Sequence, residues 1–369
     1  MENRFITIAT LNKSDADLFN NQLSDQDIIC QMSDAKAVMA NEPDGIRIKV
    51  REKDRKIAIH ILDEFSKTYG IKECEHNIFS NVIERILVPV DFSDCSKNAC
   101  NYAIGIAEKL DAEVLLLHAY YFPVINSFDL GDGLSVVVNL NDTVTEIADK
   151  AKDGLQNLYN DILTQIKQNS SEQVKLNYIL VNGNPISEIL NIYDTYHPDL
   201  IVMGTQGRTK AKREQFGSVA ATTINETKVP VLTVPENSIY RGISKVNLLY
   251  ATNFDQSDYK AIKKLMTLIY LFDVNINFVH IGKMDDTSKV KIDDLKNFFN
   301  QLYPGYQIEC SIIEHKDILL TLQKFVSDRH IDIIAMTTHK RNFITGLFYP
   351  SMTKKMLFQT DIPMLAFHA

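Results

Sequence analysis

The residues best suited to chemistry form a glycine-rich segment directly after a short apolar run. The run, residues 200–203, is typical of a fully buried strand. Gly204 ends it, Gly207 follows after two residues, and Gly217 with Ser218 comes after nine more. Glycines let backbone N–H groups approach a bulky ligand, and the helix predicted to start with Ser218 near its N-cap adds N–H donors and a positive dipole end. The pattern predicts an anion site at the carboxyl end of a strand, where ligands bind in open α/β sheets.

A plain connection between a strand and a helix is the alternative interpretation of this segment, because glycines are common in such connections. The basic side chains of the loop are also compatible with a solvated surface, where ion pairs contribute only about 0–1 kcal/mol each. Beside a polyphosphate the same side chains would screen its charge. They are Arg208, Lys210, Lys212 and Arg213.

The spacing of Gly204, Gly207 and Gly217-Ser218 resembles the nucleotide-binding signature of the universal stress protein family. The resemblance covers residues 84–236. In that family the aspartate after the first strand contacts the adenosine part of ATP, backbone after the second strand contacts the adenine, and the glycine loop with its serine holds the phosphates. The resemblance implies a site for ATP, AMP or ADP, with or without Mg²⁺, and assigns no catalytic residue and no metal ligand. The implied binding residues are Pro89, Val90, Asp91, Ala119, Met203, Gly204, Gly207, Arg208, Gly217, Ser218 and Val219.

Two side chains near this site have simpler interpretations. A carboxylate after a strand, such as Asp91, often caps the next helix. Its place at the carboxyl edge beside the glycine loop favours a ligand role. His118 is interpreted as packing within its strand, because no nucleophile is spaced to use it.

The elements that must position these residues alternate between strand and helix. Such alternation indicates a mostly parallel sheet, and the resemblance specifies a five-stranded Rossmann-like α/β sandwich of the adenine-nucleotide-hydrolase-like kind. The predicted strands are 85–91, 113–119, 174–181, 199–203 and 229–235.

The segment 243–369 repeats this plan and is interpreted as a second domain similar to universal stress proteins. Three stretches of it parallel earlier ones: 246–254 matches 86–92, 331–336 matches 197–203, and 361–367 matches 228–234. In the family, the fifth strands of two domains pair across a dimer interface. The apolar stretches 229–234 and 362–367 therefore predict an internal pseudo-dimer, and a homodimer stays open.

The second copy has lost most of the implied binding residues. Asn253, Thr337, Lys340 and Pro350 stand where the first copy has Asp91, Gly204, Gly207 and Gly217, while Ser351 keeps the serine. A non-glycine residue in a left-handed conformation costs about 1–2 kcal/mol, and each lost charge-assisted amide bond about 1.5–3 kcal/mol. These losses are comparable with most of a micromolar affinity, about 8 kcal/mol. We expect little or no ATP binding in the second copy.

Residues 1–70 are predicted to form a small α+β domain of order β-α-β-β-α. A linker at 71–83 joins it to the domain at 84–236. The predicted elements are strands at 5–9, 28–32 and 46–50, and helices from 12 and over 52–65. The segments 5–10 and 44–54 resemble the prokaryotic signal-transducing domain family, with a layout similar to half a ferredoxin-like fold. The resemblance implies sensing of a partner or ligand. The alternative is an accessory domain that supplies only an interface.

Composition narrows the function classes. The 369 residues are 45% hydrophobic and carry a net charge of -8, which argues against a general nucleic-acid binder and against binding to an acidic membrane surface. No stretch approaches the ~20 apolar residues that span a bilayer, and the N-terminus has no signal-peptide layout. The five cysteines are scattered. We expect a reducing cytoplasmic location.

Three functions remain open at this stage. The favoured one is a cytoplasmic tandem universal stress protein that binds one adenine nucleotide in its first half and signals in a stress response to an unidentified protein partner. A slow ATPase or another ATP-using enzyme on the same fold is the second, although related enzymes carry a Ser-Gly-Gly-rich loop where residues 91–96 read Asp-Phe-Ser-Asp-Cys-Ser. The third is an interaction scaffold without a ligand.

Overall fold

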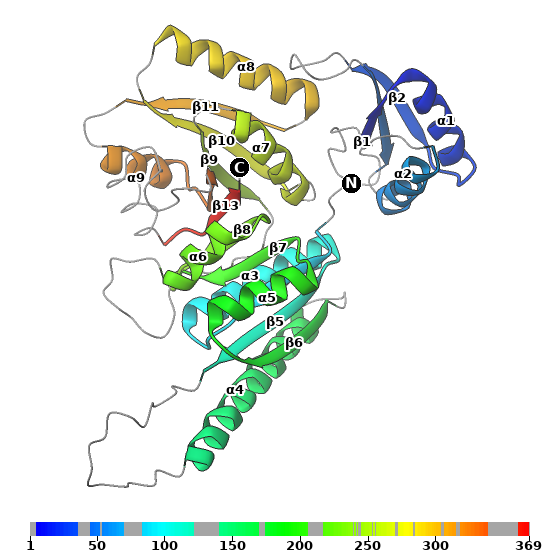
Figure 1. Ribbon diagram of the computed structural model, residues 1–369. Helices are drawn as coiled ribbons and strands as arrows, with labels where there is room; N and C mark the ends of the chain where they lie inside the picture. The colour runs from blue at the N-terminus through cyan, green and yellow to red at the C-terminus, as the bar shows by residue number, and fades with distance from the viewer. Residues whose placement is uncertain are drawn as a thin grey trace. The chain divides into compact units, whose positions relative to one another are not determined.

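The computed structural model describes most of the chain in two compact units. The described residues are 5–35, 45–51, 54–69, 83–121, 140–169, 174–205, 217–338 without 239, 241, 243–244, 253, 255, 270–271, 283–284, 304–305 and 315–317, and 361–368. One unit comprises Met1–Val82 with Lys263–Leu268 and Asp294–Gly305, and the other comprises the remainder (Figure 1). Within the described ranges, no helix is long and apolar enough to cross a membrane.

Residues 5–69 confirm the predicted order β-α-β-β-α. The elements are β1 (Phe5–Leu11), α1 (Lys13–Ser24), β2 (Cys30–Ala35), β3 (Gly45–Arg51) and α2 (Arg55–Tyr69). Strand β3 lies between β1 and β2 and is antiparallel to both. Both helices bury apolar residues against this sheet, among them Phe19, Leu62 and Phe65.

Two boundaries in this unit differ from the prediction. The second strand begins at Cys30 because the preceding residues close α1: Asp27 adopts a φ of 58°, and Ile28 N donates to Leu23 O at 2.9 Å. Helix α2 continues to Tyr69, whose ring packs on Phe65 with centroids 4.7 Å apart. The predicted linker, 71–83, lies almost entirely outside the described residues.

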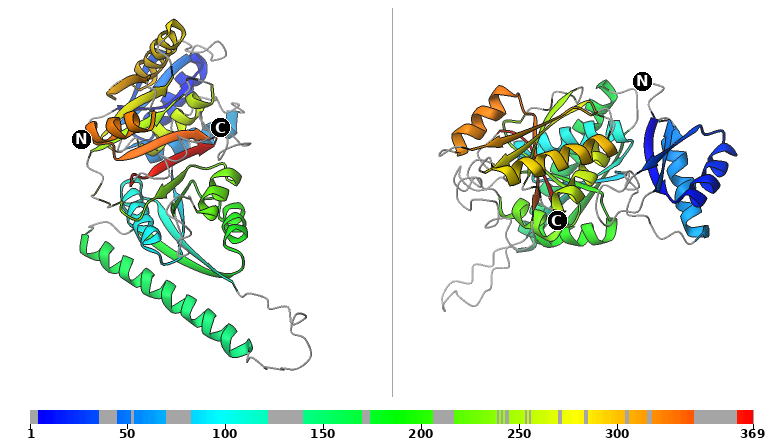
Figure 2. Two further views of the ribbon diagram at one scale, coloured as in Figure 1. Left: turned by 90° about the vertical axis from the view of Figure 1, so that its left-hand side faces the viewer. Right: turned by 90° about the horizontal axis from the view of Figure 1, so that it is seen from above.

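The first half of the larger unit forms the predicted parallel sheet. Its described strands run in the order β6-β5-β4-β7-β8, and each neighbouring pair is parallel. Figure 2 shows α3 and α4 on one face of these strands and α5 and α6 on the other. The elements are β4 (Arg85–Pro89), α3 (Asp94–Leu110), β5 (Glu113–Tyr120), α4 (Leu140–Asn169), β6 (Lys175–Asn182), α5 (Pro185–Tyr196), β7 (Leu200–Gly204), α6 (Ser218–Glu226) and β8 (Val231–Val234).

The second half has the same strand order. Its described strands run β11-β10-β9-β12-β13, all parallel, and β13 pairs antiparallel with β8, so that ten described strands form one sheet. Thr233 Oγ1 also donates to Met364 O at 3.3 Å. The elements are β9 (Val246–Ala251), α7 (Gln256–Ile269), β10 (Val274–Ile281), α8 (Asp286–Leu302), β11 (Ile308–Ile313), α9 (Ile318–Asp328), β12 (Ile333–Thr338) and β13 (Met364–His368).

Specific contacts recur at matching positions in the two halves. His118 Nδ1 lies 2.7 Å from Val90 O, and His280 Nδ1 lies 2.9 Å from Thr252 O. Because a carbonyl only accepts, each Nδ1 carries the proton of this bond. The histidine rings stack on two phenylalanines that both have positive φ angles, Phe92 (64°) and Phe254 (60°).

A second recurring contact lies at the amino end of the strands. Asp199 accepts from Arg85 N at 2.9 Å, and Asp332 accepts from Asn247 N at 2.8 Å. These matches involve local geometry that strand order alone does not require. They agree with the internal repeat that the sequence predicts.

Candidate functional site

The site begins where β4 and β7 end side by side. The two strands are direct neighbours in the sheet. Gly204 closes β7 against the first turn of α3, where an added Cβ would lie 2.7 Å from Cys95 Cβ and 3.1 Å from Ser96 N. Only glycine fits at this distance without a shift of the helix or strand. The missing side chain of Gly204 therefore serves helix packing, and its role toward a ligand stays a prediction.

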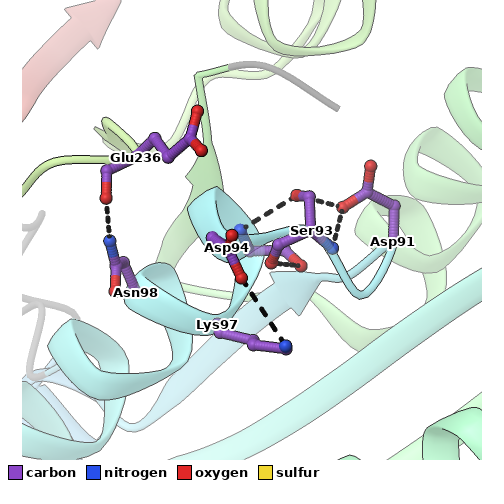
Figure 3. A network of polar contacts seen from close by, with 7 residues as sticks. Asp91, Ser93, Asp94, Lys97, Asn98 and Glu236 are labelled. Carbon is purple, nitrogen blue, oxygen red and sulfur yellow. Dashed lines mark hydrogen bonds and ion pairs between the residues drawn. The ribbon is translucent and has the colours of Figure 1, made fainter. Parts of the chain in front are cut away.

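Asp91 lies directly beyond β4 and is held by the start of α3. Its Oδ1 accepts from Ser93 N at 3.1 Å and from Ser93 Oγ at 2.5 Å, and Ser93 Oγ in turn accepts from Ser96 N at 3.3 Å (Figure 3). Ser93 is the N-cap of α3, so Asp91 orients a capping residue. The helix is therefore capped by Ser93 and not by Asp91, and the carboxylate of Asp91 is fixed at the carboxyl edge of the sheet.

The described ends of the glycine loop converge. Thr205 N donates to Val234 O at 3.1 Å, and Gly217 N donates to Thr205 O at 2.8 Å, so the start of α6 returns to the end of β7. Gly207 and Arg208 lie outside the described residues. The structure therefore brings together Gly204, Gly217, Ser218 and the end of β4 but does not describe the middle of the loop.

Helix α6 begins at Ser218, which lies next to the N-cap as predicted. Gly217 is the N-cap, and no side chain among the described residues caps the helix there. Ser218 is the first helical residue and is exposed, and the half-buried Val219 follows it. The first N–H groups of α6 therefore present an N-terminus without a side-chain cap, which is the kind of site that binds anions.

Two of the implied binding residues, Met203 and Ala119, are placed so that their backbone rather than their side chain lies at the site. Met203 is buried in the core that α5 and α6 share with the sheet, so its side chain points away from the sheet edge. Ala119 pairs with Val181 near the end of β5. Pro89 ends β4, and Val90 N donates to Leu117 O at 2.8 Å, which aligns the ends of β4 and β5.

A cavity of about 600 Å³ lies beside these strand ends and is lined on the other side by α4. Sequence reasoning did not find the contribution of α4. From the strand ends and α3 the cavity is lined by Phe92, Lys97, His118 and Tyr120, and from α4 by Ile147, Lys150, Ala151, Gly154, Asn157, Leu158 and Asp161. Phe92 follows Asp91 in the chain, and His118 and Tyr120 flank Ala119. The cavity is therefore lined by sequence neighbours of two predicted residues, Asp91 and Ala119.

The lining combines an aromatic wall with polar groups. The Phe92 and His118 rings stack with centroids 4.2 Å apart. An added Cβ on Gly154 would lie 2.9 Å from the Phe92 ring, so this glycine makes room for it. His118 was interpreted as a packing residue; the structure confirms the packing and also places the residue in the cavity wall. A glycine inside a long helix was the one sequence feature that pointed to this contact.

In the second half, the space beside the position of Gly204 is filled by the protein's own polar side chains. Thr337, at the position of Gly204, lies 2.6 Å from Tyr250 Oη through its Oγ1 and donates to Asp258 Oδ1 at 3.0 Å. Thr252 Oγ1 donates to Asp258 Oδ2 at 2.8 Å. Tyr250, Thr252 and Asp258 are all buried. Asn253, Lys340, Pro350 and Ser351 lie outside the described residues.

Two groups with raised pKa values, Cys100 and Tyr196, lie away from the carboxyl edge of the sheet. Burial raises the pKa of the Cys100 thiol in α3 to about 12, which keeps it protonated and unreactive. Burial and a hydrogen bond to Glu113 raise the pKa of Tyr196. Tyr196 O accepts from Arg85 Nη1 at the amino end of β4, the opposite end from the site. We assign both groups a structural role.

A parallel α/β sheet with helices on both faces defines a Rossmann-like fold. A model of the universal stress protein family matches residues 83–235. The chain is 33% identical over 155 residues to universal stress protein MJ0531 of Methanocaldococcus jannaschii, a match that covers 42% of this chain and 83% of that protein. It is 31% identical over 156 residues to universal stress protein MJ0577 of the same organism, covering 42% and 96% of the two chains.

The fold similarity extends further than the sequence match. A crystal structure of a universal stress protein from Archaeoglobus fulgidus aligns with a TM-score of 0.59 and 17% identity over 79% of this chain and 98% of that one. At this identity the likeness concerns the fold alone. From the sequence matches, the chain belongs to the universal stress protein family, through a domain at residues 83–235.

Proposed function

We propose that the first half binds one adenine nucleotide, ATP or its products AMP and ADP, at the carboxyl edge of its sheet. The observation that carries the proposal is the convergence of an uncapped helix N-terminus, the fixed carboxylate of Asp91 and a cavity of about 600 Å³. Pockets for small ligands and cofactors measure about 300–1,000 Å³, so the cavity is large enough for a base and its ribose.

Different groups of the site contact different parts of the nucleotide. The N–H groups at the start of α6 and the Ser218 hydroxyl bind phosphate oxygens, and Gly207 and Arg208 complete this end. Asp91 and the backbone of Ala119 contact the adenosine part. Met203, Gly204, Pro89 and Val90 shape the floor between the two strand ends. The Phe92 ring provides an apolar surface for the base.

The second half acts as a partner domain without a nucleotide, and the two halves form an internal pseudo-dimer through β8 and β13. The shared strand order, the matched histidine contacts and the fold match over 79% of the chain support a tandem arrangement. The replacement of Gly204 by Thr337, whose hydroxyl donates to the buried Asp258, supports the absence of a ligand in the second half.

The physiological role that fits this arrangement is a regulator of the stress response in the cytoplasm. Nucleotide occupancy in residues 84–236 is the signal, and a protein partner receives it. Residues 1–70 serve as a sensing domain, as their resemblance to the prokaryotic signal-transducing domain family implies. No hydrolytic residue is assigned, so binding rather than turnover is the proposed activity.

Isothermal titration of ATP into the full chain tests the proposal. Ser218→Ala removes one charge-assisted hydrogen bond, worth about 1.5–3 kcal/mol, and should weaken binding about ten- to a hundred-fold. Gly217→Pro deletes the hydrogen bond from Gly217 N to Thr205 O that returns the start of α6 to the end of β7, and it should weaken ATP binding; the φ of −57° at this position suits proline.

Ser187→Ala is the matched control, because Ser187 is an exposed serine in the first turn of α5 and lies outside the site. It should bind ATP as the unsubstituted protein does. Equal affinities for all four proteins, or no ATP binding by any of them, would contradict the proposed site.

A further inference from the structure

The segment that leaves β8 toward the second half is bound along α3. We name the described residues 235–238 and 240 the connector. Asn98 Nδ2 donates to Pro235 O at 3.3 Å. It also donates to Glu236 O at 2.6 Å (Figure 3). Tyr102 Oη and Ser238 Oγ lie 2.9 Å apart and are buried. The connector is thus attached to α3 by its backbone at one end and by a buried hydroxyl pair at the other.

Gly105 extends this attachment by one more turn. An added Cβ at Gly105 would lie 1.8 Å from Tyr240 Oη and 2.1 Å from its Cζ, so the tyrosine ring occupies the space that any other residue would fill. The Tyr102 and Tyr240 rings also meet edge to face, with centroids 5.2 Å apart. Residues 98, 102 and 105 are spaced as one stripe of a helix. This stripe faces the connector.

The same connector also contacts the second half. Asn237 Nδ2 donates to Asp361 Oδ1 at 2.9 Å. Asp361 lies just before β13, the strand that pairs with β8. Neighbouring residues of the connector therefore bond alternately to the first half, through Asn98 and Tyr102, and to the second half, through Asp361.

Both sides of the proposed nucleotide site lead to the connector. On one side, Asp91 orients the N-cap of α3, the helix that carries Asn98. On the other side, Gly217 N donates to Thr205 O, and Thr205 N donates to Val234 O, one residue before the connector starts. A ligand that contacts Asp91 and the start of α6 would stabilise both sides of this continuous set of hydrogen bonds.

We propose that the connector couples nucleotide binding in the first half to the second half of the chain. The proposal rests on the proposed function and names the regulation of the same site. A bound nucleotide holds α3 and the start of α6 in place and thereby favours the docked connector; the docked connector in turn raises nucleotide affinity. Such coupling is reciprocal, so each event changes the other by the same factor.

Hydrogen exchange and ATP titration of the full chain measure the two directions of this coupling. In the unsubstituted protein, saturating ATP should slow amide exchange in residues 236–240 about fivefold or more, the lower range of allosteric couplings. Gly105→Ala moves the Tyr240 ring off α3, although alanine forms helix better than glycine. It should abolish this slowing and raise the Kd for ATP by the same factor. Asn98→Ala, which leaves the Gly105 contact intact, should act in the same direction.

Two controls separate coupling from general damage. Asn101→Ala changes an asparagine on the same helix that takes part in none of the described connector bonds, and it should leave both measurements unchanged. In a Tyr240→Ala background, Gly105→Ala should have no further effect, because the ring with which it clashes is gone.

If ATP binds with the same Kd in all variants and connector exchange does not respond to it, the coupling is refuted while the proposed site stands. If the unsubstituted protein binds no ATP, the proposed function itself is wrong and the coupling falls with it. If Gly105→Ala still weakens ATP binding or the exchange response in the Tyr240→Ala background, the assigned contact between Gly105 and Tyr240 is also wrong.

Discussion

The substitution Gly204→Ala tests the packing that holds the site together. The new Cβ would lie 2.7 Å from Cys95 Cβ and 3.1 Å from both Cys95 C and Ser96 N. Ordinary contacts begin at 3.4 Å, and these neighbours are main-chain or Cβ atoms, so the start of α3 or the end of β7 must move. Gly204 is not among the described glycines with positive φ, so its backbone conformation accepts alanine and the crowding alone opposes it.

Two opposing effects determine how much Gly204→Ala changes the free energy of unfolding. Overpacking by one methyl group costs about 1–3 kcal/mol, and replacing glycine by alanine restores about 0.4–1 kcal/mol by restricting the unfolded chain. The net loss in the free energy of unfolding should be about 1–2 kcal/mol. Because α3 carries Ser93 and β7 leads to the glycine loop, ATP binding should weaken as well.

Urea denaturation and ATP titration measure these effects. Gly183→Ala is the matched control: this glycine also follows a strand, but its added Cβ would meet the flexible Glu188 side chain at 2.3 Å, which can move aside. Gly183→Ala should cost less than about 0.5 kcal/mol. If Gly204→Ala is as stable as the unsubstituted protein, or if the two variants lose the same amount, the assigned contact between β7 and α3 is wrong.

Three further predictions concern other parts of the structure. Thr337→Val removes the hydroxyl that joins Tyr250 to Asp258; urea denaturation should show a loss of about 2–3 kcal/mol with ATP affinity unchanged, whereas Thr337→Ser should be nearly neutral. His118→Phe and His280→Phe each delete one bond to a strand-end carbonyl and should each cost about 1 kcal/mol, but titration should show weaker ATP binding only for His118→Phe. Because burial raises the pKa of Cys100 from 9.0 to about 12, the folded state holds this proton more tightly; the free energy of unfolding should therefore fall as pH rises from 9.0 through about 12, and less so in Cys100→Ala.

Much of the fold could be predicted because hydrophobic periodicity reports burial directly. The alternation of strands and helices in residues 84–236 gave the parallel sheet, and the repeat in residues 243–369 gave its second copy. The misplaced boundaries arose where a few residues close a helix. Ile28 looked like part of a strand but pairs with Leu23 of α1, whereas Ser218 lies next to the N-cap of α6, as predicted. Such closures depend on single hydrogen bonds, which composition does not report.

The site was only partly accessible to sequence reasoning. Glycine spacing located the loop and the start of α6, because an anion site of this kind is local in sequence. The cavity wall on α4 and the hydroxyl network around Asp258 depend on contacts between residues far apart in the chain. Gly105 and Gly154 were the available signs: a glycine inside a helix costs about 1 kcal/mol and often has a packing reason, which here is an aromatic ring in each case.

The number of ATP molecules bound per chain tests the central claim most directly. Equilibrium titration of the full chain should give one ATP per chain, with that single site lost in Gly217→Pro and retained in Thr337→Val. A stoichiometry of zero or two, or one site that survives Gly217→Pro unchanged, would contradict a nucleotide site in the first half alone.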